Sequence, residues 1–227
     1  MEKRINLPVF IVNFKTYKEG TGIKALELAQ ICEETAKKTG KNIIIAVQEP
    51  DIYRISHEVS IPIFSEHMDP IDYGAHTGHV APEDLKENGA VGCLLNHSED
   101  KFRIDDLEKS IEIAKELNLM TVACANNTEI AESIAVFKPD AIAIEPPELI
   151  GGNISVSSAK PELIKESIEK IKKIDPNIPV LCGAGIKTME DVRKAIELGT
   201  QGVLIASGIV KAKNPRKKLE ELLKGFD

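Results

Sequence analysis

Residues 121–147 read TVACANNTEIAESIAVFKPDAIAIEPP, and this stretch decides the fold class. It holds two short apolar runs, at 121–125 and 141–144, without alternating polar positions. Strands that are buried on both faces of a sheet have this character. The segment at 128–136 lies between the runs and allows only about two helical turns. The stretch therefore predicts a strand, a short helix and a second strand of a parallel sheet.

The same unit recurs along the whole chain of 227 residues. Amphipathic segments separate the apolar runs, as at 23–38, 105–117 and 161–174. Eight such units predict an α/β fold, a single (β/α)8 barrel over residues 1–227 with some shortened helices. The eight apolar runs are 9–13, 43–47, 61–64, 91–95, 121–125, 141–144, 180–181 and 202–206.

A doubly wound open sheet is the alternative to the barrel. Such a sheet usually carries a glycine-rich loop after its first strand. Here the first run is followed by Asn13-Phe14-Lys15, which is not a loop of that kind. The barrel is therefore the preferred prediction.

Composition and charge narrow the function classes. No apolar stretch reaches the roughly 18 residues of a membrane span, and the N-terminus lacks a signal-peptide pattern, so we expect a cytoplasmic protein. The net charge of −7 argues against nucleic acid or an anionic membrane as partner. Four scattered cysteines are expected to be small buried residues, neither disulfides nor metal ligands: Cys32, Cys93, Cys124 and Cys182.

Polar residues follow the predicted strands at the barrel end where active sites form. Asn13 and Lys15 follow the first run, His97 and Glu99 the fourth, and Glu145 the sixth. Taken singly, the lysine could be a solvated charge, the histidine structural and Glu145 a loop cap. Small-residue loops at 183–185 and 206–208 follow the last two runs, where barrels commonly hold a phosphate through backbone N–H groups.

The segment at 146–152 has prolines at one end and glycines at the other. This pattern predicts a stiff flap on two hinges. Closure of such a flap over Glu145 would expel water and make the carboxylate more basic, as suits a catalytic base.

Together these motifs resemble the triosephosphate isomerase family, and in particular its shorter archaeal form. The matching elements span the chain: Asn13-Phe14-Lys15, the loop 74–78, Asn96-His97-Ser98-Glu99, Glu145-Pro146 with Ile150-Gly151, the loop 183–186, and Ala206-Ser207. Asp100-Lys101 stands where the bacterial and eukaryotic forms often carry arginines, and the lid and last phosphate loop also differ from those forms.

The resemblance implies interconversion of dihydroxyacetone phosphate and glyceraldehyde 3-phosphate through an enediolate, in glycolysis and gluconeogenesis, without metal or organic cofactor. It implies Glu145 as base and His97 as a neutral electrophile whose basicity a helix N-terminus lowers. Lys15 would supply positive charge, and Asn13 would orient Lys15 or donate to the substrate. Substrate phosphate would bind at Ile150, Gly185, Ala206 and Ser207, with Gly151 in the lid.

The resemblance also implies an assembly. The loop 73–79 would form a dimer interface, with Thr77 reaching the neighbouring site, and the archaeal form favours a homotetramer over a dimer. Glu99 would support Lys15, although an acid at a helix start is the simpler reading.

Three alternatives stay open at this point. His67, His76 and His79 with Asp69 and Asp72 could suggest a metal site, but their spacing lacks a recognised ligand pattern. Another phosphate-handling barrel isomerase, of histidine or tryptophan biosynthesis, would share the two phosphate loops. An inactive barrel that senses a phosphorylated ligand would bind without turnover.

Overall fold

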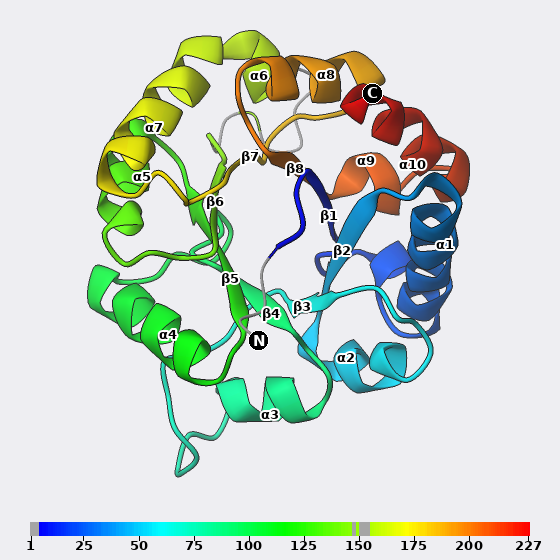
Figure 1. Ribbon diagram of the computed structural model, residues 1–227. Helices are drawn as coiled ribbons and strands as arrows, with labels where there is room; N and C mark the ends of the chain where they lie inside the picture. Colours follow the sequence, from blue (N-terminus) through cyan, green and yellow to red (C-terminus); the bar gives the residue numbers. More distant parts are fainter. Residues whose placement is uncertain (1–4, 147–148, 150–154) are drawn as a thin grey trace.

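The predicted strands close into a parallel barrel in the computed structural model, which describes residues 5–146, 149 and 155–227 (Figure 1). Each strand pairs with the next in chain order, and the last pairs with the first, with Val9 opposite Gly202. The fold prediction is therefore confirmed. The strands are β1 Val9–Asn13, β2 Asn42–Val47, β3 Ile63–Ser65, β4 Gly92–Leu95, β5 Met120–Ala125, β6 Ala141–Ile144, β7 Val180–Cys182 and β8 Gly202–Ile205.

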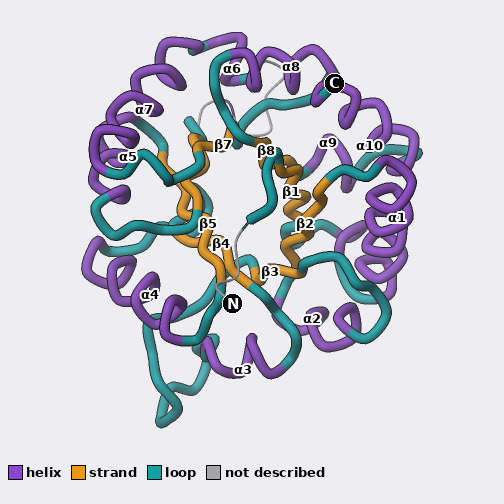
Figure 2. Tube along the Cα trace, viewed as in Figure 1, coloured by secondary structure: helices purple, strands orange, loops and turns teal. Residues whose placement is uncertain are grey.

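Helices form a ring outside the barrel (Figure 2). Two of them, α2 and α5, have only 8 residues each, and α5 is the short helix that the sequence predicted at 128–136. The α-helices of the described residues are α1 Ile23–Thr39, α2 Glu49–Ser56, α3 Pro82–Glu87, α4 Ile104–Glu116, α5 Thr128–Ala135, α6 Val156–Ala159, α7 Pro161–Ile174, α8 Met189–Glu197, α9 Ser207–Val210 and α10 Pro215–Leu223. Short 3-10 helices cover Lys18–Gly20 and Lys224–Phe226.

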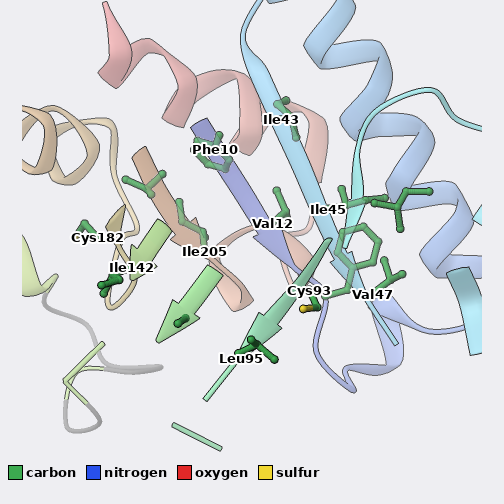
Figure 3. Packing of buried hydrophobic residues seen from close by; sticks show 14 of the residues in the cluster. Phe10, Val12, Ile43, Ile45, Val47, Cys93, Leu95, Ile142, Cys182 and Ile205 are labelled. Carbon is green, nitrogen blue, oxygen red and sulfur yellow. The ribbon is translucent and has the colours of Figure 1, made fainter. Parts of the chain in front are cut away.

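Side chains of the strands alternate between two apolar cores. In β1, Val9 and Ile11 belong to the cluster inside the barrel, whereas Phe10 and Val12 belong to the cluster between barrel and helices (Figure 3). Successive strand residues point to opposite faces, and both faces here are covered. This explains why the runs are continuously apolar. All four cysteines are buried and free, as expected.

Several strands begin or end one or two residues away from the predicted runs, and one short helix lies outside the prediction. The third apolar run was placed at 61–64, but β3 begins at Ile63, after Pro62, whose ring nitrogen has no proton to donate to a sheet. The helix α3 was not predicted, because its 6 residues are too few to show a helical period.

The carboxyl ends of the strands define one end of the barrel. The polar residues predicted as functional lie at this end, at or just after the last residue of their strands. The connection between β3 and α3 projects away from the barrel (Figure 1). In the described part of the chain, no helix combines the length and apolar character needed to cross a membrane.

Candidate active site

Side chains from distant parts of the chain meet in one pocket at the carboxyl ends of the strands. The empty space is about 480 Å³, including the part open to solvent, which suits a small ligand. Seven residues that the sequence predicted line it: Asn13, Lys15, His97, Glu145, Gly185, Ala206 and Ser207. Residues at the carboxyl ends of five strands, β1, β4, β6, β7 and β8, therefore meet in this pocket.

Glu145 follows β6 and is almost completely buried, with 2% of its surface exposed. Burial raises the pKa of this carboxyl to about 7, and hydrogen bonding to the Cys124 thiol opposes the rise. Its Oε2 atom is buried and has no hydrogen-bond partner among the described residues. A carboxylate with a free acceptor and a pKa near neutrality can accept and return a proton at physiological pH.

Gly183 lets Glu145 take this position. A Cβ atom at residue 183 would lie 2.5 Å from Cγ of Glu145, far inside contact distance. The sequence indicated a phosphate loop at 183–185, and Gly183 does line the pocket. The reason for glycine at this position is nevertheless the close approach of the Glu145 side chain.

His97 follows β4 and is also buried, with 8% exposure. Its Nδ1 accepts the backbone N–H of Glu99 at 3.2 Å, so the neutral ring carries its proton on Nε2. That Nε2 atom lies 3.5 Å from Oε2 of Glu145. The ring is therefore a neutral N–H donor beside the carboxylate.

The expected low basicity of His97 has a different cause from the predicted one. The pKa of His97 is lowered to about 4, mainly by burial and secondly by the positive charge of Lys15. The helix that follows, α4, begins only at Ile104. Desolvation, and not a helix N-terminus, is thus the main reason why the ring stays neutral.

Lys15 is held by contacts at both its backbone and its side chain. Its φ is 49°, in the left-handed region that few residues other than glycine and asparagine adopt. Oδ1 of Asn13 accepts the Lys15 backbone N–H at 3.0 Å, which supports this turn. The ammonium Nζ lies 2.7 Å from Oε1 of Glu99. Asn13 and Glu99 are therefore both positioned to orient the lysine.

The wall of the pocket after β7 and β8, which stand between β6 and β1, consists largely of backbone. Gly185 after β7 has a φ of 72°, which glycine adopts without strain. Ala206 precedes α9, and Ser207 is its first residue. The first N–H groups of a helix lack partners within it and attract anions. Lys187 adds a cationic side chain to this wall, although the sequence analysis had not singled it out.

Some predicted residues do not take part in this pocket. Thr77 is exposed in the projecting connection and does not line the pocket. Ile150 and Gly151, with most of the predicted lid, lie outside the described residues. Within the described ranges, no group of three or more His, Cys, Asp or Glu is arranged to hold a metal ion. His67 instead lies between two carboxylates, 3.3 Å from Asp69 and 2.9 Å from Asp100.

Two residues that support the site, Cys124 and Asn96, were not predicted to be functional from the sequence. Cys124 was expected only to fill space, but its thiol hydrogen-bonds to the carboxyl of Glu145. Asn96 is part of the Asn96-His97-Ser98-Glu99 motif, and its side chain is buried and hydrogen-bonded at both ends. A polar residue at the end of an apolar run was the available signal for Asn96.

The geometry defines a class of protein: a (β/α)8-barrel enzyme with a buried acid–base pair on its carboxyl rim. The triosephosphate isomerase family model matches residues 8–224. Triosephosphate isomerase of Methanosarcina barkeri is 49% identical over 220 residues, covering 97% of this chain and 99% of the relative. The enzyme of Methanothermus fervidus is 48% identical over 95% of this chain and 97% of its own length. That of Methanobacterium bryantii is 50% identical over 95% and 96%.

The chain therefore belongs to the triosephosphate isomerase family, as its resemblance to the archaeal form predicted.

Proposed function

We propose that this chain interconverts dihydroxyacetone phosphate and D-glyceraldehyde 3-phosphate through an enediolate. The observation that carries the proposal is the 3.5 Å separation of His97 Nε2 and Glu145 Oε2 in a pocket that Lys15 also lines. The reaction needs a base at carbon and a proton donor at the neighbouring oxygen, and this pair supplies both.

Proton transfer follows from the two protonation states. The Glu145 carboxylate removes the proton from C1 of dihydroxyacetone phosphate, and the C1–H bonding pair becomes the double bond of the enediolate. The neutral His97 donates its Nε2–H hydrogen bond to the developing oxyanion, and the Lys15 ammonium stabilises the same charge. As the C1–H pair forms the C1=C2 bond, the C2=O π pair moves onto O2; the O1 hydroxyl proton then passes to O2, with Nε2 of His97 as the shuttle. Glu145, now a carboxylic acid, returns its proton to C2, the C1=C2 pair forms the C2–H bond, and an O1 lone pair forms the C1=O bond of glyceraldehyde 3-phosphate.

The phosphate group would bind on the other wall, at the N–H groups of Gly185, Ala206 and Ser207. Ile150 and Gly151 belong to the same proposal through the predicted lid. Lys187 in the pocket lining supplies local positive charge, which favours an anion despite the net charge of −7. No metal or organic cofactor enters the scheme. The pathway role, in glycolysis and gluconeogenesis in the cytoplasm, is part of the proposal.

The proposal extends to a homo-oligomer, a tetramer in preference to a dimer. Tyr73 in the projecting connection is 63% exposed, and Ile104 on α4 and Val136 after α5 are 56% and 59% exposed. Exposed apolar side chains on several sides suit more than one contact between copies. Sedimentation of the purified chain tests this, and a fully active monomer would refute the interface at Thr77.

The first test of activity is a coupled assay with glyceraldehyde 3-phosphate, in which dihydroxyacetone phosphate formation is followed by NADH oxidation. We expect turnover by the purified chain. Tight phosphoglycolate binding without turnover would instead support a ligand sensor, and failure on both counts would point to another phosphate-handling barrel enzyme.

His97→Gln tests the electrophile within the same assay. We expect kcat to fall on the order of 100-fold, because an amide is a weaker and differently placed donor to the oxyanion. KM should change much less. A variant with weakened binding and normal kcat would remove His97 from this role.

A further inference from the structure

Asn96 joins β4 to His97 and has an unusual backbone. Its φ of 56° lies in the left-handed region, which asparagine tolerates better than most residues with side chains. The residue is also buried, with 7% exposure. Buried amides in proteins are nearly always hydrogen-bonded, so the partners of Asn96 show what its side chain holds in place.

Both ends of the Asn96 amide are hydrogen-bonded inside the protein. Nδ2 donates to the carbonyl oxygen of Cys124 in β5 at 2.9 Å, and Oδ1 accepts the backbone N–H of Phe102 at 3.1 Å. Backbone pairing of β4 with β5 ends at Leu95 and Ala123, so the amide extends the connection beyond the sheet. The Asn96 side chain thus attaches the segment 96–102, which contains His97, to β5 and joins the two ends of that segment.

These contacts connect the two reacting groups. His97 follows Asn96 directly, and the thiol of Cys124 hydrogen-bonds to the carboxyl of Glu145. A series of contacts therefore links His97 to Glu145: the peptide bond to Asn96, the hydrogen bond from Asn96 to Cys124, and the hydrogen bond between Cys124 and Glu145. At its ends, His97 Nε2 and Glu145 Oε2 lie 3.5 Å apart.

Lys101 braces the same turn. Its Nζ donates to the carbonyl oxygen of Asn96 at 3.2 Å. Its positive charge adds to the effect of burial in lowering the pKa of His97, and it opposes the rise that burial causes in the pKa of Glu145. This charge favours the neutral imidazole and the ionised carboxylate, the two forms that the proposed proton transfer requires.

We infer that Asn96 is a positioning residue that sets the placement of His97 relative to Glu145. The inference rests on the proposed isomerase chemistry and adds how its two groups are held together. Asn96 is absent from the residues that line the pocket, so it acts through His97 and not on the substrate.

Asn96→Gly is the direct test, because glycine accepts the left-handed backbone and only the amide is lost. We expect kcat to fall about 10- to 100-fold, since a displacement approaching 1 Å between reacting groups can cost about 100-fold. KM and phosphoglycolate affinity should stay within about threefold, because the residues after β7 and β8 are not touched.

Asn118→Gly is the matched control. Asn118 has a φ of 55° and is exposed after α4, on the other side of the barrel from the pocket. The same substitution on the same backbone should leave kcat within about twofold of the parent. Thermal denaturation of both variants separates lost stability from lost turnover, since a merely structural Asn96 would lower the melting temperature and not kcat.

The nitrogen NMR signals of the His97 ring give a readout that is independent of turnover, and His97→Gln assigns them. In the parent we expect a neutral ring with its proton on Nε2, because Nδ1 accepts the Glu99 N–H. Asn96→Gly should shift these signals towards a mixture of tautomers, whereas Asn118→Gly should not.

The outcomes separate this inference from the proposed function. A parent without isomerase activity refutes the proposed function, and the His97 signals still decide whether Asn96 orients the ring. If the parent is active, a parental kcat or a loss confined to KM in Asn96→Gly overturns the inference. Should that variant not fold, Asn96→Asp keeps Oδ1, removes the donor to Cys124, and should lose kcat in the same way.

Discussion

The two walls of the pocket are built by different means. The wall after β1, β4 and β6 presents charged and polar side chains that neighbours hold in place: His97 and Glu145 are buried, and Lys15 is partly buried. The wall after β7 and β8 presents mainly backbone, at Gly185, Ala206 and Ser207. The first wall can change protonation, whereas the second offers fixed N–H dipoles. Reaction and anchoring are therefore assigned to separate walls, and substitutions on the two should have different kinetic effects.

The largest effect is expected from Glu145→Asp on the side-chain wall. Loss of one methylene retracts the carboxylate from the substrate carbon, so kcat should fall about 100-fold or more with little change in KM. Steady-state kinetics on both triose phosphates measure this. Near-normal turnover would show that Glu145 is not the base and would end the division between the walls.

A new charge on the backbone wall should act on binding instead. Ser207→Asp places a carboxylate near the proposed phosphate site, and two unit charges about 8 Å apart repel by about 2 kcal/mol at an effective dielectric constant near 20. Phosphoglycolate should bind roughly 30-fold more weakly, and KM should rise more than kcat falls. Ser133→Asp on the exposed face of α5 adds the same charge away from the pocket and should change neither. Equal behaviour of the two variants would place the phosphate elsewhere.

Gly183→Ala connects the walls, because Gly183 follows β7 but touches Glu145. The added methyl group would displace the base, and we expect kcat to fall about tenfold. In a Glu145→Ala background the Cγ atom that the new methyl group would meet is absent, so the same substitution should cost much less of the remaining activity. Additive losses in this double-mutant cycle would show that Gly183 acts on something other than the base.

The smallest effect on catalysis is expected at Glu66, a half-buried acid beside Lys15 that has no role in the proposed reaction. Burial and the charge of Glu49 raise the pKa of Glu66 to about 8, and Oε1 has no partner among the described residues. The folded protein therefore holds this proton more tightly than the unfolded chain, whose pKa is about 4.5. Stability that is present below pH 4.5 is lost as the pH rises towards 8.

Glu66→Gln should remove this loss. Thermal or urea denaturation at pH 8.5 should show a gain on the order of 3 kcal/mol, shrinking towards zero near pH 4.5, while kcat stays within about twofold. The parent measured at both pH values is the control. A gain that does not depend on pH would mean that packing, and not the proton, is responsible.

The sequence predicted the polar residues that line the pocket better than it predicted the residues that hold them in place. Glu145, His97 and Lys15 could be identified because polar residues directly after apolar strands are few and chemically distinctive. The contacts that tune them, from Cys124 and Asn96, join positions far apart in the chain, and no local pattern shows such pairs. The cause of the low pKa of His97 was missed for the same reason, because burial depends on the packing of the whole barrel.

The fold could also be predicted from the sequence, except for the short helix α3 and the start of β3. Runs buried on two faces are unmistakable when eight of them recur, so the barrel followed from β1 through β8. The helix α3 is too short to show a period, and Pro62 shortens β3 because a proline cannot donate to the sheet. The wall after β7 and β8 could be predicted only once the barrel fold had been inferred, because glycine and alanine in loops carry no distinctive chemistry.

Oε2 of Glu145 is buried without a hydrogen-bond partner in the described part of the chain, and this bears on the design of inhibitors. Folding has already stripped this oxygen of water, so a ligand with an N–H or hydroxyl group aimed at it gains a hydrogen bond without further dehydration of the enzyme. A compound with an ether oxygen at the same place meets two repelling lone pairs. Screening amide or hydroxamate analogues of the triose skeleton against matched ethers should reveal that selectivity directly.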